Sequence, residues 1–454
     1  MENKNADAQY NKMVNTPVWK LVTTLAIPTV ISMLITSIYN MADTFFVSQI
    51  STEASAAVGV VFPIMSIIQA CGFTLGMGSG SLLSIKLGQK KNDEASEISA
   101  TAFYTAIFIG FLITIFGNIF AAAFLRLVGA SEAVLPYAQD YARYIFFGAP
   151  FMCASFVLNN DLRAEGKAFF SMIALTLGGL INIVLDPLFI FTFDLGISGA
   201  AIATIVSQFI SFSILLSWYV RRKVICSMSI KHFTKRPAVL GHIVSMGMPS
   251  LARQGMASIA TILLNTMSAR YGGDSAIAAM SIVTKICMFM GSIMIGIGQG
   301  FSPVSGYNYG AKRYDRVKKA YIFMVISSFG LLSILAIICY GFAPQIMKAF
   351  RDDATVIAVG TVALRWQAAF FPFHPIIVGT NMLMQSTKHV KSALYLSMNR
   401  QGIYFIPAII LLSTTFGLTG VEISQAIADI LSTFTAIPFM IYFFKKLSKM
   451  EGLK

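Results

Sequence analysis

Two aspartates, Asp43 and Asp186, stand out because each lies inside a long apolar stretch of the sequence. An acid in such a stretch costs about 2.5–3.5 kcal/mol to insert into a membrane and usually has a function. Carboxylate oxygens bind hard cations such as Na+, and a desolvated carboxylate can instead hold a proton. The two acids therefore predict a site for a coupling cation or proton.

Polar residues spaced around these acids could complete the site. Asn182 precedes Asp186 by four residues, so the two share one face of a helix. Tyr39 has the same relation to Asp43. We predict a coupling site made of Asp43, Asp186, Asn182, Thr204, Tyr39 and Tyr141, of which the first four could hold Na+. The alternatives are that the Asp–Asn pair only holds helices together and that the tyrosines only pack.

The second half of the chain carries basic residues inside its apolar stretches. Those near mid-stretch are Arg253, Lys285, Arg365 and Arg400. One acid, Asp429, lies at a similar depth. Buried charges must pair or face water, so we expect several of the four to line a substrate cavity or to pair with Asp429. A purely structural ion-pair cluster is the alternative. Met288 is a further candidate for the cavity wall, because methionine adapts to varied ligands.

Prolines and asparagines at other points have simpler interpretations. Pro28 and Pro187 lie inside predicted helices, where proline removes a hydrogen bond, and we predict a hinge at each. Asn159 and Asn160 fall near the end of an apolar stretch, beside Arg163. For these two we favour loop capping over ion binding.

The elements that carry these residues are predicted to be membrane helices. The chain of 454 residues is 56% hydrophobic and 12% charged, and its mean hydropathy is +0.71. Soluble domains have about 25% charged residues. Stretches of about 20 apolar residues predict transmembrane helices. Twelve are expected, near 21–47, 56–85, 98–122, 134–159, 168–191, 198–220, 241–269, 276–304, 318–342, 354–380, 391–414 and 418–444.

Basic residues in the connections set the predicted orientation. With the N-terminus inside, 25 of the 34 lysines and arginines fall in inside segments and four in outside segments. This bias places both termini in the cytoplasm. It also places both acids in the outer half of the membrane. No cleavable signal peptide is visible, so we expect the first span to remain in the protein.

The two halves of the sequence repeat each other at an offset of about 222 residues. Gly78 matches Gly300, and Ala149-Pro150 matches Phe371-Pro372. Each half has six predicted spans, so both halves insert with the same orientation. We predict an all-α integral membrane fold in which two pseudo-symmetric six-helix bundles surround a central cavity. The predicted parts are an N-lobe (1–220), a cytoplasmic linker (221–240) and a C-lobe (241–454).

The repeat is asymmetric in its charges. At an offset of 222 residues Asp43 matches Asn265, which cannot titrate. At an offset of 220 residues Asp186-Pro187 matches Ile406-Pro407, which keeps the proline without the acid. We therefore assign cation coupling to the first half. The acidic first half and the basic second half would make a bipolar cavity that accepts zwitterionic or anionic amphiphiles as well as organic cations.

Three motifs resemble signatures of the multidrug and toxic compound extrusion (MATE) transporters. They are GQGFSPVSGYNYGAK at 298–312, LRAEG at 162–166, and Asn182 followed by Asp186-Pro187. The resemblance covers essentially the whole chain and is greatest for the bacterial DinF-like and MepA-like branch. It implies that the protein lies in the cytoplasmic membrane of a bacterium. It implies that the N-lobe cation and proton site is formed by the residues matching Asp43, Asp186, Tyr39, Tyr141, Asn182 and Thr204.

These observations predict a cation-coupled multidrug efflux antiporter that works by alternating access. It would exchange Na+ or H+ for amphiphilic organic compounds, contact membrane lipid, need no cofactor and no nucleic acid, and function as a monomer. A flippase for lipid-linked precursors is the alternative within the same superfamily. A membrane-embedded enzyme is the alternative from another class. The sequence contains neither a nucleotide-binding motif nor an acid or histidine cluster that would support catalysis.

Overall fold

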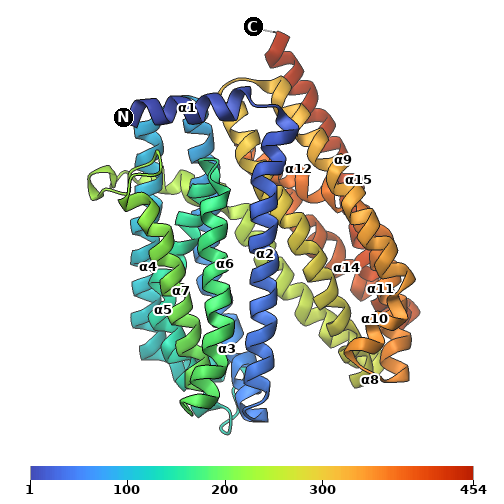
Figure 1. Ribbon diagram of the computed structural model, residues 1–454. Coiled ribbons are helices and arrows are strands. Elements are labelled where there is room, and N and C mark those ends of the chain that lie inside the picture. The colour runs from blue at the N-terminus through green and yellow to red at the C-terminus, as the bar shows by residue number, and fades with distance from the viewer. Residues whose placement is uncertain (1, 453–454) are drawn as a thin grey trace. The chain divides into compact units, whose positions relative to one another are not determined.

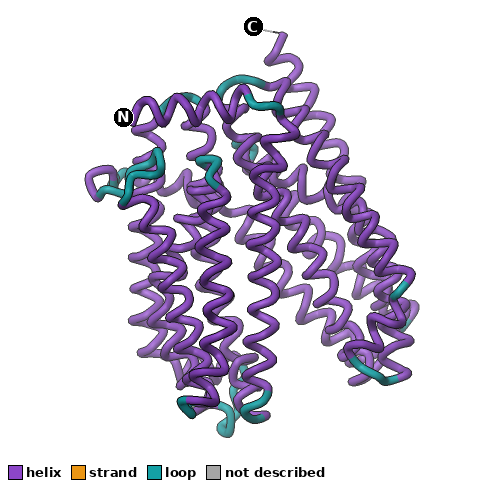
Figure 2. Tube along the Cα trace, viewed as in Figure 1, coloured by secondary structure: helices purple, strands orange, loops and turns teal. Residues whose placement is uncertain are grey.

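The computed structural model describes residues 2–452, which are almost entirely helical, with no strand among them (Figures 1 and 2). The elements of the first half are α1 (Glu2–Asn15), α2 (Val18–Ser48), α3 (Thr52–Gly88), α4 (Asn92–Val128), α5 (Leu135–Ala164), α6 (Ala168–Pro187), the π-helix η1 (Leu188–Thr192), α7 (Gly196–Val220) and the short η2 (Ile230–His232). Those of the second half are α8 (Pro237–Gly310), α9 (Tyr314–Gly341), α10 (Ala343–Phe350), α11 (Ala354–Phe370), η3 (Phe371–Phe373), α12 (His374–Ser386), α13 (Val390–Met398), the π-helix η4 (Asn399–Tyr404), α14 (Phe405–Phe416) and α15 (Leu418–Gly452).

Within residues 2–452, ten helices are long and apolar enough to cross a membrane. One of them, α8, contains 74 residues and has a non-helical backbone at Gly273, where φ is 63° and ψ is −160°. Such a conformation suits glycine alone, and it divides α8 into two of the predicted spans. The run α13–η4–α14 matches another predicted span that π-helical turns interrupt. These two additions bring the ten helices to the twelve predicted spans.

The chain forms two compact units, which confirms the predicted fold of two helical bundles. Unit 1 contains Met1–Asn15 and Ile27–Gly247, and unit 2 contains Thr16–Ala26 and Met248–Lys454. The beginning of α2 thus belongs to the unit formed by the second half of the chain. Conversely, the beginning of α8 belongs to unit 1. Each exchange ends just before a proline, Pro28 in α2 and Pro249 in α8.

Two glycines that match in the repeat contact the exchanged segments, which are residues 16–26 of α2 and residues 237–247 of α8. In unit 1, a Cβ added to Gly78 of α3 would lie 2.0 Å from the carbonyl oxygen of Ile243. In unit 2, a Cβ added to Gly300 of α8 would lie 2.4 Å from the Cα of Ala26. The backbones therefore touch at both places, and any larger residue would push them apart. Close helix packing therefore accounts for these two glycines.

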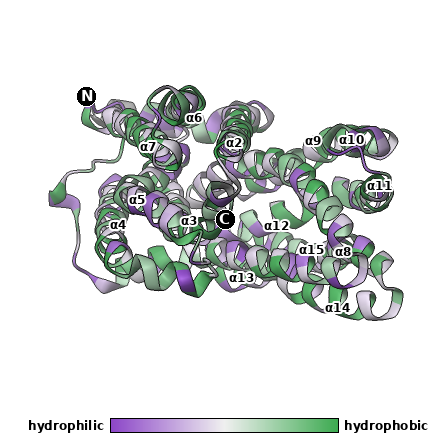
Figure 3. Ribbon diagram, turned by 90° about the horizontal axis from the view of Figure 1, so that it is seen from below, coloured by the Kyte–Doolittle hydropathy of each residue, from purple (hydrophilic) through white to green (hydrophobic). Residues whose placement is uncertain are grey.

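Helix α5 is the central helix of unit 1 and packs against α3, α4 and α7. The surfaces of both units instead expose large apolar side chains, such as Phe108, Ile119 and Phe434. Figure 3 shows this hydrophobic character on helices of both units. A bilayer solvates such surfaces, whereas water does not.

The connection between α7 and α8 is held against unit 1 by Glu165, which is fully buried. Its two carboxylate oxygens accept hydrogen bonds from the backbone amides of Ile225 and Cys226, both at 2.8 Å. Helix α1 contacts the same place, because Gln9 donates to the carbonyl oxygen of Glu165 at 2.7 Å. Pro237, predicted to lie in the linker, is the first residue of α8, a position where proline fits well.

Candidate functional site

The two predicted acids of unit 1, Asp43 on α2 and Asp186 on α6, lie near each other. Each has a carboxylate oxygen without a hydrogen-bond partner among the described residues. Asp186 is fully buried, and its Oδ1 accepts a hydrogen bond from Asn182 Nδ2 at 3.2 Å. Its Oδ2, Asp43 Oδ1 and Asn182 Oδ1 are buried and have no hydrogen-bond partner among the described residues. The two carboxylates are close enough to interact electrostatically. Three unsatisfied buried acceptors are costly unless a cation or a proton joins them.

The predicted hydroxyl groups lie beside this pair. Tyr141 of α5 is fully buried, and its hydroxyl group has no hydrogen-bond partner among the described residues. It lies close to Thr204 of α7 and within electrostatic range of both acids. Tyr39 of α2 lies near Asp43 and the side chain of Gln208. The structure thus brings all six predicted residues together, from four helices.

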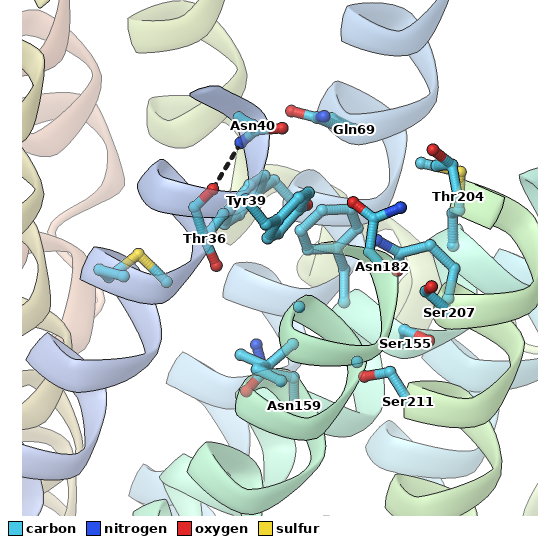
Figure 4. A pocket seen from close by; sticks show the side chains of 18 residues that line it. Thr36, Tyr39, Asn40, Gln69, Ser155, Asn159, Asn182, Thr204, Ser207 and Ser211 are labelled. Carbon is cyan, nitrogen blue, oxygen red and sulfur yellow. Dashed lines mark hydrogen bonds between the residues drawn. The ribbon is translucent and has the colours of Figure 1, made fainter. Parts of the chain in front are cut away.

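A cavity of about 140 Å³ adjoins these residues inside unit 1. Tyr39, Asn182 and Thr204 line it, whereas Asp43 and Asp186 do not (Figure 4). The other polar side chains on its wall are Thr36, Asn40, Gln69, Ser155, Asn159, Ser207, Gln208 and Ser211. A cavity of this size and polarity has room for several water molecules, and a cation could keep part of its hydration shell there.

Most of these further wall residues were not predicted. Thr204, Ser207 and Ser211 follow one another at helical spacing on one face of α7, and this stripe was a usable signal. Thr204 lies two turns inside α7, which begins at Gly196. A position inside the helix is what allows Thr204 to share one face with the serines.

The prediction of loop capping for Asn159 and Asn160 was wrong. Both lie within α5, which continues to Ala164. Asn159 Oδ1 accepts a hydrogen bond from Ser171 of α6, and Asn159 also lines the cavity. Asn160 accepts from Arg163 Nη2 at 3.2 Å. The helix is longer than the apolar stretch, because paired polar side chains extend it.

Pro187 is the last residue of α6 and follows the acid directly, and the hinge expected there remains a prediction. The chain continues as the π-helix η1, in which hydrogen bonds skip one residue more than in an α-helix. Proline lacks the amide hydrogen that a regular turn would need at this point. Asp186 therefore lies at a break in regular helical bonding.

In unit 2, Asp429 of α15 has a full set of partners. Arg400 Nε donates to its Oδ1 at 2.7 Å, and His374 Nε2 lies 2.9 Å from its Oδ2. Gln425 also donates to Oδ1, at 2.9 Å. The expected pairing with a basic residue holds for Arg400, while the contact with His374 was not predicted.

The other predicted residues of the second half are dispersed. Arg365 is exposed, donates to the carbonyl oxygen of Tyr340 at 3.3 Å and lies over the ring of that residue. Lys285 and Met288 are exposed on α8, Met288 by 67%. Arg253 is half-buried, and no carboxylate among residues 2–452 forms an ion pair with it. Only Arg400 of the four basic residues therefore pairs with Asp429.

No group of three or more histidines, cysteines, aspartates and glutamates among the described residues could hold a metal ion. The donors beside Asp186 are carboxylate, amide and hydroxyl oxygens, which suit an alkali cation or a proton. The chemistry open to the unit 1 site is thus reversible binding of one of these ions.

Comparisons with known proteins agree over nearly the whole chain. The family model MatE matches residues 28–188 and 249–411, once in each half. Multidrug export protein MepA of Staphylococcus haemolyticus (strain JCSC1435) is 26% identical over 437 residues, which cover 96% of each chain. MepA of Staphylococcus aureus (strain N315) is 26% identical over 433 residues, 95% of each chain. A solved structure described as the outward-facing conformation of a multidrug resistance MATE family transporter of the MOP superfamily superposes with a TM-score of 0.92 at 27% identity, covering 96% of this chain and 98% of that one.

Proposed function

The chain belongs to the MatE family, and we propose that it is a multidrug efflux antiporter driven by Na+ or H+. In this proposal an inward-moving cation binds in unit 1, and amphiphilic organic compounds leave the cell by alternating access. The names of the staphylococcal relatives, multidrug export proteins, support export as the direction. Such a transporter needs no cofactor and catalyses no covalent reaction.

One observation carries the coupling part of the proposal. Asp43 Oδ1, Asp186 Oδ2 and Asn182 Oδ1 are buried acceptors without partners among the described residues, beside a cavity whose wall carries several polar side chains. A protein gains free energy when such oxygens bind a cation or a proton, and it loses that energy when the ion leaves. A site of this kind can therefore link ion binding to a change of conformation.

We further propose that Pro28 and Pro187 are the hinges of this change. Pro28 lies two residues after the point where α2 passes from unit 2 to unit 1. Its carbonyl oxygen accepts a hydrogen bond from Ser32 at 2.9 Å, which steadies the turn that follows the break. Pro187 adjoins Asp186 directly, so bending there would move a carboxylate of the site.

The test is transport by proteoliposomes under separate Na+ and H+ gradients. We expect Asp186→Asn and Asp43→Asn to lose gradient-driven efflux, because the neutral amide neither titrates nor supplies a full negative charge. The gradient that drives the wild type identifies the ion. Asp194→Asn is the matched control, since Asp194 is exposed and its left-handed backbone tolerates asparagine. Unimpaired coupled efflux in both site variants would remove the proposed site.

The same proposal includes the arrangement in the cell. From the excess of lysine and arginine in alternate connections we infer that both termini are cytoplasmic. The staphylococcal relatives support the bacterial cell membrane as the location of the protein. We also propose that a single chain with its surrounding lipid is the working unit. Reporter fusions at the two termini test the first point, and cross-linking in intact membranes tests the second.

A further inference from the structure

The surface of unit 1 has a groove between α4 and α5, which pack side by side (Figure 1). The volume of this groove is about 550 Å³. Its polar side chains are those of Thr114 and Asn118 on α4 and of Gln139 and Arg143 on α5. None of these four residues lines the polar cavity of about 140 Å³. The groove is therefore a separate site, which the coupling proposal does not use.

Contacts between the two helices close one end of the groove. Thr114 Oγ1 donates a hydrogen bond to the carbonyl oxygen of Phe146 at 2.6 Å. One helical turn before Thr114, a Cβ added to Gly110 would lie 2.3 Å from the Cα of Pro150, so the two backbones touch there. The other polar residues of the groove come later than Thr114 in α4 and earlier than Phe146 in α5. The groove therefore extends from these contacts toward the place where α4 ends and α5 begins.

The groove faces lipid in the outer half of the membrane. Only 6% of the residues in the most apolar stretch of α4 are buried, the smallest share among the ten long apolar helices. In the orientation inferred from the basic residues, α5 begins outside, and Arg143 follows its first residue, Leu135, by eight residues or about 12 Å. Side chains of a helix lean toward its N-terminus, so Arg143 leans toward the outer headgroups. The exposed apolar side chains of the groove wall are Ile115, Ile119 and Phe147.

Arg143 has no anion within the part of the chain that the structure describes. It is exposed, and no hydrogen bond or ion pair joins it to another described residue. Asp140, one turn nearer the outer end of α5, is exposed, does not line the groove and forms no ion pair with Arg143. A guanidinium group stays protonated in proteins, and a charge at membrane depth needs a partner. The phosphates of phospholipids are anions that a long arginine side chain can reach from this depth.

The repeat provides a counterpart of this arginine in unit 2 that already has a partner. At an offset of 222 residues Arg143 matches Arg365, and Asn118 matches Tyr340. The same offset relates the first residues of α4 and α9, and the proline inside α5 to that of η3. Arg365 Nε donates to the carbonyl oxygen of Tyr340 at 3.3 Å, and the guanidinium group lies 5.4 Å from the centre of its ring. Asparagine has no aromatic face to offer, so Arg143 stays open.

We propose that the groove between α4 and α5 binds an anionic glycerophospholipid of the outer leaflet, with the lipid phosphate on Arg143. The acyl chains lie along the three apolar side chains of the groove wall, and the amides of Asn118 and Gln139 bind glycerol and ester oxygens. The single charged side chain of the groove is positive, so a lipid with a net negative charge fits better than a zwitterionic one. The site does not depend on the proposed efflux function, and the inferred orientation decides only which leaflet supplies the lipid.

The test uses a tryptophan in the groove as a reporter of the lipid beside it. Ile115→Trp places the reporter on the groove wall, in a protein whose Trp19, Trp218 and Trp366 are replaced by phenylalanine. The protein is reconstituted in mixed bilayers in which either phosphatidylglycerol or phosphatidylcholine carries bromine on its acyl chains, and bromine quenches tryptophan fluorescence. We expect phosphatidylglycerol to bind beside the reporter about tenfold more tightly than phosphatidylcholine, since a charge-assisted hydrogen bond favours it.

Three variants of this reporter protein identify the groups that bind the lipid. Arg143→Gln should remove the preference for phosphatidylglycerol, and Arg143→Lys should keep part of it because the charge remains. Asn118→Tyr introduces the residue that covers the arginine in unit 2, and it should remove the preference while Arg143 is still present. The matched control is Ile337→Trp, since Ile337 corresponds to Ile115 and is also exposed. A reporter at this position should show equal binding of the two lipids.

Four results would overturn the inference. The first is equal quenching of Ile115→Trp by the two brominated lipids. The second is a preference for phosphatidylglycerol that survives both Arg143→Gln and Asn118→Tyr. The third is the same preference at Ile337→Trp, which would reflect general attraction of an anionic lipid to a basic protein. The fourth is loss of the preference when soluble glycerophosphate is added, which would show that the groove binds phosphate without acyl chains.

Discussion

Asp186 and Asp429 are both buried acids in apolar helices, but they differ in how many of their carboxylate oxygens have hydrogen-bond partners. Asp186 has one weak partner and a free oxygen, beside a cavity. Asp429 has an arginine, a histidine and a glutamine, which use both of its oxygens. Burial therefore does not mark a coupling site by itself. In the proposed function, the unpaired acceptors beside Asp186 are the atoms that bind the coupling ion, because binding removes the cost of burying them without a partner.

Truncating Asp429 should give the largest loss of stability. In Asp429→Ala the Arg400 guanidinium loses its counter-charge inside the bundle, which costs about 3–5 kcal/mol. Asp186→Ala should cost far less, because among the described residues it removes a single hydrogen bond, from Asn182 at 3.2 Å, and leaves no buried charge unpaired. Thermal unfolding of the two purified variants in one detergent measures the difference. Equal destabilisation would contradict the distinction between a structural acid and a coupling acid.

Moving the carboxylate of Asp43 to the matching position in unit 2 should not restore ion-driven efflux. Asn265 is the repeat partner of Asp43 and is exposed. We expect the double variant Asp43→Asn, Asn265→Asp to remain as inactive as Asp43→Asn alone, about 100-fold below the wild type, because one misplaced carboxylate lacks the partners that a bound ion requires. Ion-gradient efflux in proteoliposomes is the measurement. Recovery of efflux would show that the two units are interchangeable in coupling.

How much of this site the sequence can predict depends on the kind of interaction. The acids and their i, i+4 partners were predictable, because helical spacing alone places Asn182 beside Asp186. The partner of Asp429 was not, since choosing Arg400 among four basic residues depends on helix rotation and on the π-turn at Asn399–Tyr404. Exchange of residues 16–26 between units is a tertiary feature that no local pattern records.

The packing glycines should behave alike in the two units, in contrast to the acids. Gly78→Ala and Gly300→Ala each force a methyl group against the backbone of an exchanged segment, and we expect each to cost about 1–3 kcal/mol. Gly255→Ala is a control, because a Cβ added there meets nothing within 4 Å. Thermal unfolding is again the readout. A large effect in one unit only would show that the repeat does not extend to this contact.

Removing a single hydroxyl group should have the smallest effect on efflux, and the result should show whether Na+ or H+ is the coupling ion. Thr204→Val and Tyr141→Phe keep side-chain shape and remove one oxygen from the unit 1 site. If Na+ is the coupling ion, we expect each to raise the Na+ concentration for half-maximal efflux by about tenfold or less, because a neutral ligand oxygen contributes about 1 kcal/mol. If H+ is the ion, both variants should transport almost normally. Neither change should affect the pairing around Asp429.

The exchanged beginnings of α2 and α8 have a consequence for how the protein could be divided. A cut in the connection between Val220 and Pro237 leaves every helix intact, yet neither half then has a complete bundle. The first half needs residues 237–247 from its partner, and the second half needs residues 16–26 in return. Two separately expressed halves should therefore assemble only together, as reciprocal complements, and an ancestral half-length chain built in this way would have had to pair with a second copy.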